Sequence, residues 1–91
     1  MTREVLSVLS NDLNLRVFDA VARGGTVRLK DLEEKLEVSQ DDIESALNRL
    51  EEAGLITSQE APQHVEDFRI SYPTTSGLST RRQLRRLELA T

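Results

Sequence analysis

The sequence of 91 residues contains no cysteine and no tryptophan, and its only aromatic residues are two phenylalanines and one tyrosine. The lack of cysteine excludes disulfide bonds, cysteine-ligated zinc and thiol chemistry within this chain. The scarcity of aromatic rings leaves few candidates for stacking on unpaired bases. We therefore expect one small domain whose core is packed mainly by aliphatic side chains.

Long apolar runs are also missing. None approaches the roughly 20 residues that a membrane-spanning helix needs. The N-terminal stretch MTREVLSVLS contains two charged residues and lacks the apolar core of a signal peptide. We expect a cytoplasmic protein without a membrane partner.

Catalytic and metal-binding patterns are absent as well. No histidine lies at a spacing suited to a catalytic triad, and no glycine-rich phosphate loop is present. The single histidine, His64, has no second histidine or cysteine near it, so a solvated side chain is the simpler interpretation. We expect no enzymatic activity, no metal and no cofactor.

The net charge of −4 conceals an uneven distribution. Residues 21–60 contain five basic and ten acidic side chains, whereas residues 61–91 contain five basic and three acidic ones. Binding to nucleic acid through phosphate groups requires basic side chains. The acidic middle of the chain opposes such binding, and the basic tail favours it.

Apolar spacing predicts the first elements. Helices are expected over residues 2–9 and from residue 13 to Gly24-Gly25, because glycine ends helices at little steric cost. Residues 26–28 are long enough only for an edge strand or an extended link.

The segment 29–56, LKDLEEKLEVSQDDIESALNRLEEAGLI, predicts a helix, a turn, a longer helix and the start of a strand. Glu37 and Val38 fall in the turn, and Ser39 is expected to cap the longer helix, which ends at Gly54. The core face of this longer helix is expected to contain Ile43, Ala46, Leu47, Leu50 and Ala53.

The rest of the chain predicts a hairpin and a final helix. Residues 55–58 read as one strand, and Phe68, Ile70 and Tyr72 alternate with polar residues as in a half-buried strand. After residues 73–77, the sequence STRRQLRRLELAT favours a helix. Because its apolar edge is narrow, we expect it to pack against the first helix, in the same chain or in a second copy.

From Ser10 to Ile56 the sequence resembles the winged helix-turn-helix domains of bacterial and archaeal transcription regulators, especially the ArsR and MarR types. LEEAGLI, where the long helix leads into the wing, is the most specific part of the match. Thr74 and Gly77 resemble the Thr-x-x-Gly that opens the C-terminal helix in many such proteins. Glu37 departs from the pattern, because the tight turn often has glycine there.

The resemblance implies a fold that is mainly α with a small β-hairpin (α+β). A single winged helix-turn-helix domain would span residues 1–91, with a three-helix core and wing at 10–77. The flanking helices, 1–9 and 78–91, are the expected dimerisation elements.

The resemblance also implies a transcription regulator that binds double-stranded DNA as a homodimer, with recognition helix 40–53 and wing 55–72. Asparagine and glutamine can bond adenine in the major groove, and a carboxylate can accept from cytosine. The candidate DNA-contacting residues are Ser39, Gln40, Asp41, Glu44, Ser45, Asn48, Arg49, Arg69, Arg81, Arg82, Arg85 and Arg86.

Other interpretations of these charges stay open. Asp41 and Asp42 lie in the first turn of their helix, where each is worth about 0.3 to 1 kcal/mol against the helix dipole. The arginines of the tail suit phosphate groups, solvent or the acidic face of a partner subunit. The alternative function is therefore a winged-helix module whose acidic helix binds another protein instead of DNA.

Overall fold

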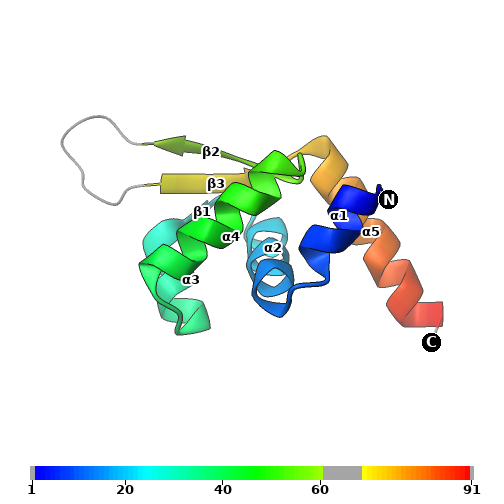
Figure 1. Cartoon of the computed structure of the whole chain (residues 1–91), viewed down its shortest axis with the longest axis horizontal. Helices are drawn as coiled ribbons and strands as arrows, with labels where there is room; N and C mark the ends of the chain where they lie inside the picture. Colours follow the sequence, from blue (N-terminus) through cyan, green and yellow to red (C-terminus); the bar gives the residue numbers. More distant parts are fainter. Residues whose placement is uncertain (1, 61–68, 91) are drawn as a thin grey trace.

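The computed structural model describes residues 2–60 and 69–90. The helices are α1 (Arg3–Leu9), α2 (Asp12–Gly24), α3 (Leu29–Leu36), α4 (Gln40–Glu52) and α5 (Thr75–Ala90), and the strands are β1 (Val27–Arg28), β2 (Ile56–Glu60) and β3 (Arg69–Pro73). Figure 1 shows the sheet beside the packed helices α2, α3 and α4. The helices α1 and α5 lie at one end of the molecule, and the end of β2 at Glu60 and the start of β3 at Arg69 lie at the other. The expected winged helix-turn-helix architecture is confirmed.

Short polar side chains start the first helices. The Thr2 side chain accepts a hydrogen bond from the Val5 amide, and the Asn11 side chain accepts one from the Asn14 amide. Gly25 then ends α2 with a φ of 76°, a conformation that glycine adopts without steric cost. The starts of α1 and α2 and the end of α2 therefore follow from local capping.

The helix-turn-helix consists of α3, a short turn and α4. Glu37 takes the left-handed conformation at the end of α3, with φ 55° and ψ 43°, and is the only non-glycine residue with positive φ in the described part of the chain. Ser39 caps α4 by accepting from the Asp42 amide at 3.4 Å. The expected departure at Glu37 is thus a backbone conformation that glycine would adopt more easily.

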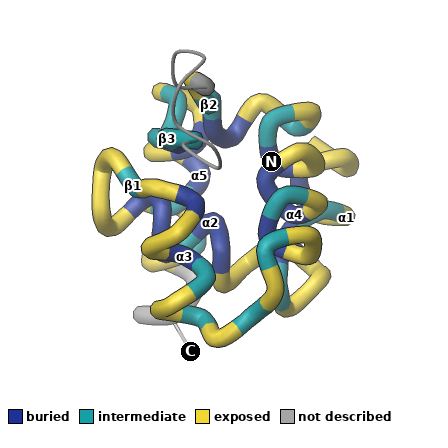
Figure 2. Tube along the Cα trace, turned by 90° about the vertical axis from the view of Figure 1, so that its left-hand side faces the viewer, coloured by how far each residue is buried: buried dark blue, intermediate teal, exposed yellow. Residues whose placement is uncertain are grey.

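The core lies between α2, α3, α4 and the sheet, and Figure 2 shows its buried residues along the inward sides of these elements. Phe18 of α2 and Leu32 of α3 are buried. The expected core face of α4 is confirmed, since Ile43, Ala46, Leu47 and Leu50 are buried and Ala53 packs against them.

The wing is part of a sheet with one more strand than a hairpin. β3 lies in the middle, between β1 and β2, and both pairings are antiparallel. Residues 27 and 28, expected to form an edge strand or a link, form the edge strand. The hydroxyls of Ser58 and Ser71 lie 2.9 Å apart across β2 and β3, which satisfies the fully buried Ser71. Phe68 and His64 lie outside the described residues.

The C-terminal helix begins earlier than expected, at Thr75 instead of after Gly77. Thr74 Oγ1 accepts a hydrogen bond from the Gly77 amide, as a residue that caps a helix does. Gly77 is needed because a Cβ atom there would collide with the carbonyl oxygen of Leu55. The glycine that suggests a break in the sequence therefore lies in the first turn of α5, where it allows the helix to approach the backbone before β2.

α5 packs against the body of the domain, and residues of α1 and α5 line one pocket. It contacts α2 and β3, and Leu84 packs against the main core. Val5 and Leu9 of α1 are buried, but Leu6 is 53% exposed and is not covered by the residues that the structure describes. None of the helices in the described ranges is long and apolar enough to cross a membrane.

Candidate nucleic-acid interface

The helix α4 presents a polar face opposite its core face. Ser45, Asn48 and Arg49 are exposed on it, and Glu44 is half-buried. The same helix lies beside the sheet that forms the wing (Figure 1). The fold therefore brings the candidate residues of α4 and Arg69 of β3 to one surface.

The N-terminal turn of α4 is acidic. Asp41 and Asp42 are both exposed there, and the Asp42 amide is bonded to Ser39. Carboxylates at this end stabilise the helix through its dipole. They also repel phosphate groups, so the first turn of α4 has two opposite effects on a DNA-binding function.

Arg69, at the start of β3, is joined to α4. Its Nη2 atom donates to Asn48 Oδ1 at 3.0 Å and to Glu51 Oε2 at 2.9 Å. The side chain of Arg69 is only 13% exposed, so its charge is directed into the protein surface and largely compensated by Glu51. Glu51 was not among the residues that the sequence predicts for this site, because nothing in its local spacing indicates a partner on a distant strand.

The arginines of α5 do not share this surface. Figure 1 shows α5 at the opposite end of the molecule from the free ends of the wing strands. Arg82, Arg85 and Arg86 are exposed, whereas Arg81 is half-buried. A single copy of the chain therefore does not present α4, the wing and the arginines of α5 to one short stretch of DNA.

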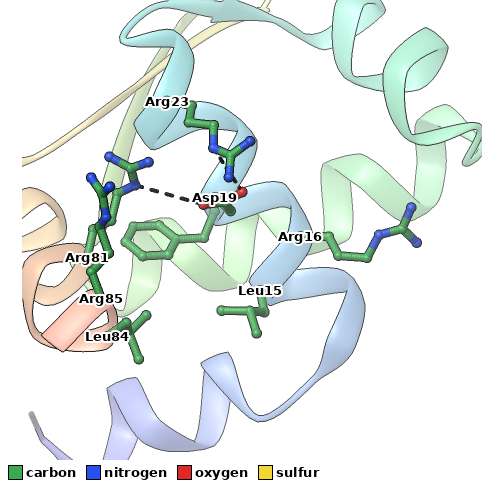
Figure 3. A pocket seen from close by; sticks show the side chains of 8 residues that line it. Leu15, Arg16, Asp19, Arg23, Arg81, Leu84 and Arg85 are labelled. Carbon is green, nitrogen blue, oxygen red and sulfur yellow. Dashed lines mark ion pairs between the residues drawn. The ribbon is translucent and has the colours of Figure 1, made fainter. Parts of the chain in front are cut away.

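Arg81 belongs to a groove between α2 and α5 with a volume of about 550 Å³. Its Nε lies 3.8 Å from Asp19, an ion pair too long for a hydrogen bond, and this buried atom has no hydrogen-bond partner among the described residues. Figure 3 shows Asp19 between Arg81 and Arg23, while Arg16 points away from them. Arg85, another candidate residue, lines the same groove. Asp19 is a further neighbour that the sequence did not indicate.

The remaining candidate residues are placed as follows. Ser39 serves as the cap of α4, and Gln40 is the first residue of that helix.

No group of three or more histidine, cysteine, aspartate or glutamate side chains in residues 2–60 and 69–90 is arranged to hold a metal ion.

Comparisons with known proteins agree with this architecture. The fold is similar to that of the reduced form of the transcriptional regulator YodB from B. subtilis, with a TM-score of 0.79, 19% identity and coverage of 98% of this chain and 89% of that one. For an ArsR-like transcriptional regulator from Rhodococcus sp. RHA1 the TM-score is 0.68, with 23% identity and coverage of 96% and 78%. For FabT from Streptococcus pneumoniae in complex with DNA it is 0.74, with 18% identity and coverage of 94% and 66%.

At these identities the structural likenesses show the fold, which is that of the winged-helix regulators. The sequence model of the MarR family matches residues 11–64, more than half of the chain, so this protein belongs to the MarR family. No curated protein matches the sequence.

Proposed function

We propose that this protein is a transcription regulator that binds double-stranded DNA through α4 and the wing. The observation that carries the proposal is the exposed polar face of α4 beside the sheet, in a domain of the MarR family. The structural neighbour FabT, which was solved in complex with DNA, supports the same use of the fold. Ser45, Asn48 and Arg49 are the side chains best placed to reach base edges and phosphates. This function involves no catalysis, and we expect it to operate in the cytoplasm.

The charges of α4 define what kind of DNA binding is expected. Exposed Asp41 and Asp42 oppose phosphates at the N-terminal turn, and Arg69 is compensated by Glu51. Few phosphate contacts are then available from α4 and the described strands of the wing. Since the dependence of affinity on salt grows with the number of phosphates neutralised, we expect weak binding to random DNA and a shallow salt dependence.

We propose further that the protein acts as a homodimer through α1 and α5. Leu6 of α1 is 53% exposed and Leu78 of α5 is 40% exposed, and both lie in the terminal helices. Figure 1 shows these two helices at the same end of the molecule, away from the wing. A dimer formed there would bury both leucines and leave α4 of each copy free.

Fluorescence anisotropy with random duplex DNA tests the proposal. We expect binding at low salt that weakens as salt is added, whereas the absence of binding at high micromolar protein would contradict it.

The exposed arginines of α5 are tested by replacing Arg82 and Arg86 with alanine. A smaller salt slope would place them at phosphates, and an unchanged slope would exclude that contact.

Sedimentation at high concentration tests the dimer, and a monomer of about 10.3 kDa would contradict it.

The alternative function is binding of a basic protein surface by the acidic end of α4. Exposed Asp41 and Asp42 favour it, because they suit a cationic partner better than a phosphate backbone. Replacing both by asparagine separates the two functions. The affinity for duplex DNA should rise if DNA is the partner, and it should stay undetectable if α4 serves only a protein.

A further inference from the structure

Asn48 is an exposed polar side chain of α4 that is hydrogen-bonded to a residue of the wing, Arg69. Its Oδ1 accepts from Arg69 Nη2 at 3.0 Å, and the same nitrogen donates to Glu51 at 2.9 Å. Glu51 is one helical turn from Asn48, so the guanidinium bridges two groups on one face of α4. The ion pair with Glu51 keeps Arg69 in position to hold Asn48.

The chemistry of the guanidinium determines which end of the amide it holds. Arginine has donors and no acceptor, so only the oxygen of Asn48 can face it. The amide NH2 group therefore points elsewhere on the exposed side of α4. Without Arg69, the two ends of the amide would be free to exchange places.

We propose that Arg69 is a positioning residue that sets base specificity by holding Asn48 with its NH2 group available to DNA. This inference rests on the proposed function. It assigns Arg69 a role different from phosphate binding, in agreement with its 13% exposure and its pairing with Glu51.

The base preference follows from the groups that each base presents in the major groove. Guanine presents two acceptors, N7 and O6, which suit an NH2 donor. Adenine presents a donor beside its acceptor, so the usual paired contact from asparagine would require the oxygen that already accepts from Arg69 to accept a second hydrogen bond in the groove. Cytosine presents a donor alone. Asn48 held by Arg69 is therefore expected to select guanine.

The experiment is selection from a library of duplexes, followed by anisotropy on the selected site and on versions changed at single base pairs. The proteins are the unaltered chain, Asn48→Ala, Arg69→Lys, Arg69→Met and the double variant N48A/R69M. Arg16→Met is the matched control, because it removes one exposed arginine on α2. Circular dichroism and thermal unfolding establish that each variant is folded.

The unaltered protein should prefer guanine at one position by about tenfold over adenine, and N48A should abolish that preference. R69M should lower the preference to the level of N48A, with an unchanged salt slope. The double variant should be no worse than N48A. R69K should retain part of the preference, because an ammonium group can bridge the same two oxygens, and Arg16→Met should retain all of it. If R69M does not fold, the comparison of R69K with N48A and the unaltered protein decides.

Other outcomes overturn the inference. A preference that survives R69M, or adenine selected at the position that depends on Asn48, would show that Arg69 does not fix the amide in this way. A reduced salt slope in R69M would show a phosphate contact instead. Failure of the unaltered protein to bind any duplex would contradict the proposed function itself, which is a different result from binding with a preference that Arg69 does not affect.

Discussion

Replacing Thr74 by valine should weaken the junction between the end of α4 and the start of α5. Thr74 Oγ1 donates to the carbonyl oxygen of Gly54 at 2.6 Å and accepts from the Gly77 amide at 2.9 Å. One hydroxyl therefore ties the end of α4 to the start of α5. Valine preserves the branched shape of threonine and removes both hydrogen bonds.

The magnitude follows from these two bonds. Loss of a helix cap costs about 1 kcal/mol, and loss of an ordinary hydrogen bond costs about 1 kcal/mol. The free energy of unfolding should therefore fall by about 2 kcal/mol. For a domain of this size that corresponds to a decrease in Tm of roughly 8 to 16 °C.

The assay is urea unfolding followed by circular dichroism, with all proteins at one concentration because a dimer would make stability depend on concentration. Thr75→Val is the matched control, because it replaces threonine by valine at the next residue. Thr75 is exposed. Thr74→Ser should restore most of the loss. A difference of less than about 0.5 kcal/mol between the valine variants at 74 and 75 would show that the Thr74 hydroxyl does not stabilise this junction, because surface substitutions alone produce effects of that size.

Three further substitutions test separate parts of the structure. Glu37→Gly should raise the free energy of unfolding by about 0.5 to 1 kcal/mol, because it relieves a left-handed residue, and a loss in urea unfolding would contradict this. Gly77→Ala should lower it by about 3 kcal/mol, because the added Cβ collides with the carbonyl of Leu55; an unchanged midpoint would exclude that close approach. Glu44→Gln should raise the affinity for random duplex roughly threefold at low salt, and less at high salt. Glu4→Gln, on α1, is its control in the same anisotropy titration, and equal effects of the two would mean that α4 does not face DNA.

Much of the fold is predictable from sequence because its signals are local. The core face of α4 follows from the spacing of Ile43, Leu47 and Leu50, and the ends of α2 and α4 follow from Gly25 and Gly54, which both have φ 76°. The start of α5 differs from the sequence prediction for a nonlocal reason. Gly77 ends no helix, and its small size serves the approach of α5 to Leu55, which is distant in sequence.

The candidate site is less predictable because its charges are paired across the fold. Arg69 reads in the sequence as a basic residue of the wing available to phosphates, yet it is bonded to Asn48 and Glu51 of α4. Arg81 reads as one of a cluster, yet it faces Asp19 of α2. Periodicity shows which side of an element a residue occupies, but it does not show which element lies opposite that side.

DNA recognition by α4 and the wing is tested most simply by the affinity of the unaltered protein for duplex DNA as a function of salt. Anisotropy should detect binding at low salt, with a slope of log affinity against log salt that corresponds to few phosphate contacts, about 0.9 per contact. A selected sequence should bind more tightly than random DNA under the same conditions. The absence of binding to either duplex at high micromolar protein and low salt would show that α4 and the wing do not recognise DNA.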